Sequence, residues 1–137
     1  MKVSDRMTRD VITVRADESI RAAVDLVEQK RLRRFPVMRD GELIGIVTDR
    51  DLRNATASSV VLTERKYHDF LLDTVKVESV MSADPATIGP SADLKEAARR
   101  ILDLKVGGLP VVEDGKLLGI ITETDLINTL LEELPDD

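Results

Sequence analysis

The chain has 137 residues, no cysteine and three aromatic residues, and its 26 acidic and 20 basic residues give a formal charge of −6. The absence of cysteine excludes disulfides, a thiolate nucleophile and a zinc–thiolate site. The net negative charge repels a phosphate backbone and so argues against a nucleic-acid partner. No apolar run approaches the roughly 20 residues that span a bilayer, and no signal peptide is recognisable, so we expect a cytoplasmic protein without membrane contact.

An internal repeat organises the chain. After a shift of 74 residues, positions 2–54 align without gaps with 76–128 and are identical at 17 of 53 positions, several of them Gly, Pro and Asp. Such a repeat predicts two copies of one structural unit. We therefore expect four parts: repeat 1 at 1–55, an inter-repeat segment at 56–75, repeat 2 at 76–131 and an acidic tail at 132–137.

Each copy begins with a predicted strand and a predicted helix. The strands fall at the apolar runs 11–14 and 86–88, and the helices that follow are expected to be capped by Asp17 and Ser91. Apolar residues then recur with the spacing of a helix that faces a core. They are Ile20, Ala23, Val24 and Val27 in the first copy and Leu94, Ala97, Ala98 and Ile101 in the second.

A hairpin and a second helix complete each copy. Segments 35–48 and 109–122 place Asp-Gly between two β-branched runs, which is a strong hairpin signal, and a helix is expected to open after Thr48 and after Thr122. The sequence thus predicts an α/β (α+β) fold of two tandem β-α-β-β-α repeats. Because one unit of about 50 residues buries little surface, we expect the two to pack together with pseudo-twofold symmetry.

The inter-repeat segment contains ERKYHDFLLD at 64–73, which favours a short amphipathic helix. It carries two of the three aromatic residues, Tyr67 and Phe70. Two interpretations remain open: the helix packs over the end of the core, or it contributes a contact between two copies of the chain.

The motif Thr48-x-x-Asp51, repeated as Thr122-x-x-Asp125, lies at a strand-to-helix junction. Its spacing fits a capping box, which explains it without any ligand. The same place also suits binding, because a helix N-terminus offers unpaired N–H groups to an anion. Thr adds a hydroxyl, and Asp supplies the two acceptor oxygens that can hold a ribose diol.

The residues just before each motif are compatible with a ligand. Gly45 and Gly119 allow a ligand, or another backbone segment, to approach closely. Ile46 and Ile120 are apolar and can cover one face of a base. A small duplicated chain also favours a cleft between the two copies over a cavity inside either.

The pattern RFPVMRDGELIGIVTDRDL, repeated as GLPVVEDGKLLGIITETDL, resembles the CBS domain, and two in tandem resemble a Bateman module. The resemblance covers residues 1–131. The middle segment, ERKYHDFLLDTVKVESVM, is further similar to the CBS-pair proteins of the acetoin-utilisation (AcuB) type, here without the ACT domain that some of them carry.

This resemblance implies a regulatory ligand that contains adenine, namely AMP, ADP, ATP or S-adenosylmethionine, held in clefts between the repeats. Asp51 and Asp125 would take the ribose hydroxyls, and Thr48 and Thr122 would contact ribose or phosphate. The residues implied around the adenine are Ile12, Ile46, Ala86 and Ile120.

The two sites are not equivalent in sequence. Arg34 falls where some family members place a phosphate-binding Arg, and its alternative is a solvated side chain. Gly108 stands at the matching position of repeat 2, so a cation is missing there. Arg50, which aligns with Thr124 in repeat 2, is a second positive charge present only in repeat 1, and it can contact a polyphosphate. We therefore expect unequal affinities.

Other function classes have weaker support. His68 is the only histidine and lies outside the repeats, and no metal-ligand series is present, so we expect no catalysis, no catalytic cofactor and no metal site. Arg31, Arg33 and Arg34 form the only basic cluster. The sequence favours a non-catalytic adenine-nucleotide sensor that signals to a protein partner. The family resemblance further implies homodimers that form through the helical faces. The alternative is a partner-binding scaffold whose ligand clefts are vestigial.

Overall fold

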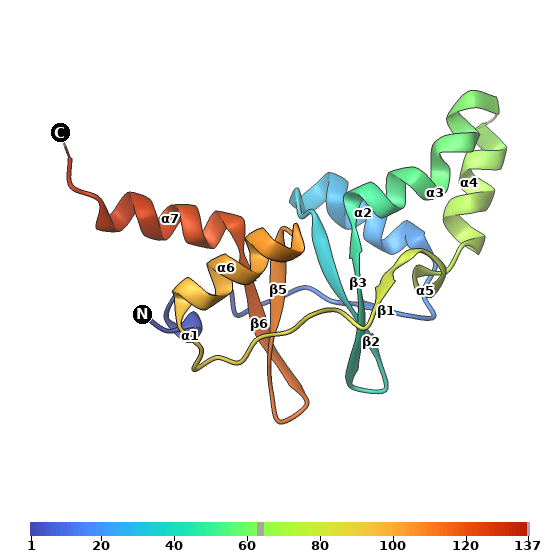
Figure 1. Cartoon of the computed structure of the whole chain (residues 1–137). Helices are drawn as coiled ribbons and strands as arrows, with labels where there is room; N and C mark the ends of the chain where they lie inside the picture. Colours follow the sequence, from blue (N-terminus) through green and yellow to red (C-terminus); the bar gives the residue numbers. More distant parts are fainter. Residues whose placement is uncertain (63–64, 137) are drawn as a thin grey trace. The chain divides into compact units, whose positions relative to one another are not determined.

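The computed structural model describes residues 1–62 and 65–136 (Figure 1). Glu64, at the start of the predicted inter-repeat helix, and Asp137, at the end of the predicted acidic tail, lie outside the described residues. The chain forms two compact units. We call Ile12–Asp84 the central unit, and Met1–Val11 together with Pro85–Asp137 the terminal unit.

The central unit contains one four-stranded sheet and its helices. The strand order is β1-β2-β3-β4, with β1 parallel to β2 and the other neighbours antiparallel. In chain order the elements are β1 (Val14–Arg15), α2 (Ile20–Lys30), β2 (Arg34–Arg39), β3 (Glu42–Thr48), α3 (Asp49–Leu62), α4 (Arg65–Thr74), α5 (Val77–Val80) and β4 (Ser82–Ala83).

The terminal unit repeats this plan with fewer regular strands. Its elements are α1 (Val3–Arg6), α6 (Leu94–Leu104), β5 (Gly108–Glu113), β6 (Lys116–Thr122) and α7 (Glu123–Glu133). The antiparallel pair β5–β6 is flanked by two single bridges, from Ile88 to Val111 and from Thr8 to Ile120. Helix α6 packs against β5 and α7 (Figure 1). The predicted β-α-β-β-α order is confirmed. The first strand, predicted at 11–14, lies instead at Val14–Arg15, and the strand predicted at 86–88 is reduced to the Ile88 bridge.

Both predicted hairpins are confirmed. Asp40 and Gly41 have φ values of 51° and 79°, and Asp114 and Gly115 have 52° and 77°. Positive φ at both central residues is what a type I′ turn requires, and this turn matches the twist of the flanking strands. Each hairpin also has a register shift at the same place, Val37/Met38 and Val111/Val112.

The predicted helix caps were wrong by two residues. Helix α2 has Ser19 as its N-cap, and α6 has Asp93, whose side chain accepts a hydrogen bond from the Lys95 N–H. Asp17 and Ser91 instead lie inside turns closed by bonds from Glu18 N–H to the Arg15 carbonyl, at 3.2 Å, and from Ala92 N–H to the Gly89 carbonyl, at 3.3 Å. A residue within such a turn is too early in the chain to cap the helix.

The first segment of each repeat packs in the unit formed mainly by the other repeat. Val3 is fully buried in the terminal core with Leu109, Val111 and Ile121, and its N–H donates to the Ala92 carbonyl at 2.9 Å. Its counterpart Val77 is fully buried in the central core, which includes Phe35, Val37 and Val47. The central unit is therefore a continuous stretch of chain, whereas the terminal unit is assembled from both ends.

The inter-repeat segment is helical over most of its described length. Helix α3 continues to Leu62, and α4 follows with Leu72 buried against the central core and Phe70 exposed. Leu72 thus supports the packing interpretation, while Phe70 leaves an apolar side chain on the surface. Among the described helices, none has both the length and the apolar character needed to cross a membrane.

Candidate functional site

The Thr48-x-x-Asp51 motif joins β3 to α3 and forms a reciprocal cap. The Thr48 N–H donates to Asp51 Oδ2 at 2.9 Å, and the Asp51 N–H donates to Thr48 Oγ1 at 3.2 Å. The capping interpretation is therefore confirmed. Within the described residues, no hydrogen bond reaches Asp51 Oδ1 and none uses the Thr48 hydroxyl proton. Both residues are only half-buried, so an acceptor and a donor remain available at this helix start.

The Thr122-x-x-Asp125 motif joins β6 to α7 with the same two bonds, at 2.9 and 3.2 Å. Two further bonds distinguish it. Thr122 Oγ1 donates to Asp125 Oδ2 at 3.0 Å, and Thr8 Oγ1 donates to Asp125 Oδ1 at 3.1 Å. Here the hydroxyl proton of the Thr is used, and both carboxylate oxygens already accept hydrogen bonds. The two motifs thus share a backbone geometry and differ in what they offer a ligand.

A cation accompanies the central motif. Arg34 begins β2 and is the cross-strand partner of Thr48, while Gly108 holds the same place opposite Thr122. A Cβ on Gly108 would lie 3.0 Å from the Ile121 carbonyl oxygen, so this position is crowded as well as uncharged. Arg50 is exposed in the first turn of α3. Positive charge is therefore available only in the central unit among these sequence-predicted site residues.

The predicted apolar residues also differ between the units. Ile12 is 38% exposed and Ile46 is half-buried in the central unit. In the terminal unit Ile120 is 6% exposed, and Ala86 packs against the core. The central unit thus combines Ile12, Arg34, Ile46, Thr48, Arg50 and Asp51. The terminal unit combines Ala86, Gly108, Ile120, Thr122 and Asp125.

Gly45 and Gly119 were expected to allow the close approach of a ligand or of another backbone segment. In the structure a backbone segment approaches each of them. A Cβ on Gly45 would lie 2.9 Å from the Ser82 carbonyl oxygen, and one on Gly119 would overlap the Thr8 carbonyl oxygen. Sequence reasoning missed Thr8 itself. The only indication in the sequence that Thr8 belongs to the site is that it aligns with another hydroxyl residue, Ser82, in the repeat.

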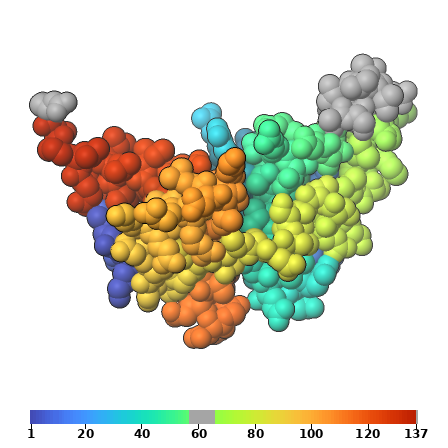
Figure 2. Space-filling view, viewed as in Figure 1, coloured from blue at the N-terminus to red at the C-terminus, as the bar shows by residue number. Residues whose placement is uncertain are grey.

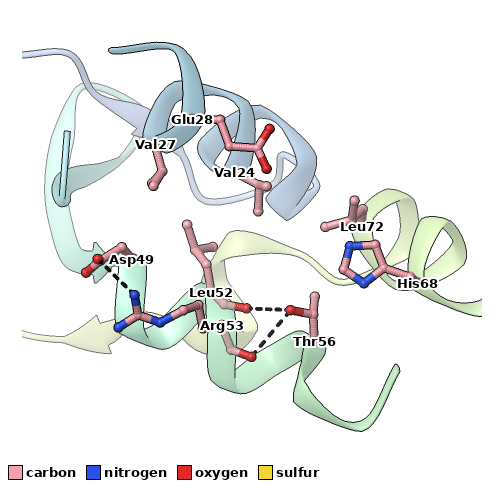
Figure 3. A pocket seen from close by; sticks show the side chains of 9 residues that line it. All are labelled: Val24, Val27, Glu28, Asp49, Leu52, Arg53, Thr56, His68 and Leu72. Atoms are coloured by element: carbon pink, nitrogen blue, oxygen red, sulfur yellow. Dashed lines mark hydrogen bonds and ion pairs between the residues drawn. The ribbon is translucent and has the colours of Figure 1, made fainter. Parts of the chain in front are cut away.

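A separate cavity lies between α2, α3 and α4 in the central unit (Figure 3), with a volume of about 290 Å³. Its lining residues are Val24, Val27, Glu28, Asp49, Leu52, Arg53, Thr56, His68 and Leu72. The terminal unit has the corresponding groove between α6 and α7, with a volume of about 320 Å³. It is lined by the repeat counterparts Ala98, Ile101, Leu102, Glu123, Leu126 and Ile127.

The two cavities differ in their cover and in their polarity. In the central unit α4 contributes His68 and Leu72, whereas repeat 2 has no counterpart of α4 within the described chain. Leu102 and Ile127 stand where repeat 1 has Glu28 and Arg53. The terminal groove is therefore more apolar and lacks the helix that borders the other. In the described part of the chain, no group of three acidic or His side chains is arranged to hold a metal ion.

Comparison with known proteins identifies the repeat. The family model described as the CBS domain matches the chain twice, at residues 3–58 and 77–132. A CBS domain-containing protein of Dictyostelium discoideum is 35% identical over 134 residues, which cover 96% of this chain and 92% of the relative. Some relatives are much longer: the chain spans 22% of an inosine-5′-monophosphate dehydrogenase from Korarchaeum cryptofilum. In that enzyme the matched part is one segment of a larger protein.

Two crystal structures match nearly the whole chain. CBSX2 of Arabidopsis thaliana in complex with AMP is 28% identical, with a TM-score of 0.82, and the alignment covers 98% of this chain and 99% of that one. A Vibrio cholerae protein described as an acetoin utilization protein (AcuB) is 32% identical, with a TM-score of 0.80, and the alignment covers 99% and 98%. The similarity to AcuB predicted from the middle segment is confirmed.

Proposed function

Because the chain belongs to the CBS-domain family and consists of a pair of such domains, we propose that it is a regulatory sensor that binds an adenine nucleotide or S-adenosylmethionine. The observation that carries this proposal is the half-buried Thr48–Asp51 pair. Its cap leaves a hydroxyl proton and a carboxylate oxygen unused within the described residues. The CBSX2 complex with AMP, which shares the fold over nearly the full length, supports AMP as the first ligand to test.

Each part of a nucleotide has a candidate partner in the central unit. A carboxylate oxygen that accepts nothing from the protein can take a ribose hydroxyl. The Arg34 guanidinium favours a phosphate, since a planar cation offers several N–H donors. Ile12 and Ile46 keep apolar surface accessible for a base. None of these groups forms a nucleophile–base pair, and we propose a binding function without catalysis.

Calorimetric titration with AMP, ADP, ATP and S-adenosylmethionine tests the proposal. We expect micromolar binding of at least one of them and a loss of at least tenfold in affinity in Asp51→Asn, because an amide offers only one acceptor oxygen. Asn still caps helices well, so the variant should remain folded. Asp49→Asn is the matched control, since it removes the same charge two residues earlier, from a carboxylate that pairs with Arg53. If none of the four binds, the scaffold alternative replaces the sensor.

We further propose that two copies of the chain associate through the α6–α7 face. The side chains of these helices lie at the surface of the terminal unit (Figure 2). Leu102, which lines the apolar groove described above, is 77% exposed, and Leu131 on α7 is 71% exposed. An exposed apolar patch of this kind marks an interaction surface. A signal can then pass to a protein partner if ligand binding favours one arrangement of the helices over another.

Sedimentation velocity tests this association. Leu102→Glu and Ile127→Arg give the terminal groove the charges that repeat 1 carries at Glu28 and Arg53, and we expect the double variant to sediment as a monomer. Phe70→Glu is the comparison variant, because it places a charge on the exposed face of α4 in the central unit. Loss of the dimer in Phe70→Glu alone would assign the contact to α4 and not to α6–α7. A parent chain that is itself monomeric would exclude the dimer.

A further inference from the structure

The carboxylate of Asp125 is already hydrogen-bonded on both oxygens by its own chain. Asp125 Oδ2 accepts from the Thr122 N–H at 2.9 Å and from the Thr122 hydroxyl at 3.0 Å, and Oδ1 accepts from the Thr8 hydroxyl at 3.1 Å. Thr8 comes from the other end of the sequence. A hydroxyl that donates to a carboxylate is the same interaction that a ribose would make there. Thr8 thus takes one of the two hydrogen bonds that Asp125 Oδ1 can accept, and it competes there with a ribose hydroxyl.

The position of Thr8 is fixed by its backbone. Its N–H donates to the Ile120 carbonyl at 2.9 Å, and the Ile120 N–H donates back to the Thr8 carbonyl at 2.9 Å. Only a residue without a side chain, Gly119, allows this close approach. Because the backbone is held on both sides, the hydroxyl reaches Asp125 with little further loss of conformational freedom. The bond is therefore a built-in competitor.

The central unit has the same backbone arrangement without the competitor. Ser82 is the repeat counterpart of Thr8 and pairs with Ile46, as Thr8 pairs with Ile120. Within the described residues, however, no side-chain hydrogen bond joins Ser82 to Asp51. The two units therefore differ here in one side-chain hydrogen bond, and their backbones follow the same path.

We propose that Thr8 lowers the nucleotide affinity of the Asp125 site by competing for Asp125 Oδ1, which makes the Asp51 site the tighter of the two. This inference rests on the proposed function. It is independent of the contrast between Arg34 and Gly108, because it concerns the ribose acceptor and not the phosphate. The net contribution of one such hydrogen bond corresponds to about a fivefold change in affinity.

The test is a nuclear magnetic resonance titration of the isotope-labelled chain with AMP, in which the amide signals of Asp51 and Asp125 report on the two sites separately. Thr8→Val keeps the shape of the side chain and removes the hydroxyl. We expect the AMP concentration at half-saturation of the Asp125 signal to fall about fivefold in this variant, while that of the Asp51 signal stays unchanged. Ser82→Ala is the matched control and should alter neither value.

The outcomes separate this inference from the function on which it rests. Higher affinity at Asp125 alone in Thr8→Val supports the competition. Equal or weaker binding at Asp125 overturns it, because Thr8 would then be neutral or would orient the carboxylate for the ligand, and AMP binding at Asp51 would leave the proposed function standing. If neither signal responds to AMP in either chain, both the function for this nucleotide and the competition are refuted.

Discussion

Truncation of Val3 or Val77 should weaken the unit in which the side chain is buried and not the repeat to which it belongs in sequence. Both side chains are fully buried, Val3 in the terminal core and Val77 in the central core. Val→Ala removes about 1.6 kcal/mol of transfer free energy, at about 0.8 kcal/mol per carbon. The cavity left behind adds about 1 kcal/mol. We therefore expect each variant to lose about 2.5 kcal/mol of local stability.

Native-state hydrogen exchange reads this loss residue by residue. In Val3→Ala, amides of residues 85–137 should exchange about 60-fold faster, while those of the central unit keep their protection. Val77→Ala should show the reverse pattern, with faster exchange within 12–84. Each variant is thus the control for the other. Faster exchange of residues 12–54 in Val3→Ala would refute the packing of the first segment in the terminal unit.

Three further perturbations follow from the local geometry. Lys105 is the C-cap residue of α6 and has a φ of 56°. Because glycine adopts this conformation without strain, Lys105→Gly should raise the free energy of unfolding, measured by denaturant titration, by about 0.5–1 kcal/mol. A destabilised variant would contradict this. Gly119→Ala should lower the thermal midpoint, because its Cβ would overlap the Thr8 carbonyl oxygen, and an unchanged midpoint would show that the segment moves freely. The hydrogen bond from Arg21 lowers the pKa of Asp73 in the folded chain. The Arg21–Asp73 pair therefore stabilises the fold above the unfolded pKa of Asp, about 3.9, and this contribution is lost as the pH falls below that value. Asp73→Asn should therefore lose less stability than the parent between about pH 6 and pH 3, and equal losses would exclude the pair.

Much of the local structure was predictable because short-range chemistry determines it. Asp-Gly pairs occupy both hairpin turns with positive φ, which few other residue pairs adopt readily. The Thr-x-x-Asp spacing gave the caps of α3 and α7, since the reciprocal bonds involve only residues three positions apart. The starts of α2 and α6 were misplaced because each is preceded by a turn rich in residues that cap helices equally well. Such a turn offers several local hydrogen-bonding choices, and the packing of the helix selects among them.

The exchange of the first segments was not predictable from the repeat. Val3 and Val77 are identical, and the surfaces that receive them are copies of one another, so each segment fits either unit by its own chemistry. Which unit receives each first segment depends on the lengths of the connecting segments and on how the rest of the chain folds. The same ambiguity concealed Thr8, because its contact with Asp125 joins positions 117 apart in sequence. The repeat was enough to predict the two Thr-x-x-Asp motifs, but it did not determine which first segment packs beside each motif.

The assembly of the terminal unit from both ends of the chain has a consequence for its synthesis. Translation delivers residues 12–84 as an uninterrupted stretch, so the central unit can fold while the ribosome is still working. Residues 1–11 emerge before the central unit, yet Ala92 and Ile120, to which they hydrogen-bond, follow the central unit in the chain. Val3 and Thr8 therefore remain without these partners until residues 92 and 120 have left the exit tunnel. A nascent chain arrested soon after residue 84 leaves the tunnel would carry a folded central unit, while residues 1–11 would still lack their partners.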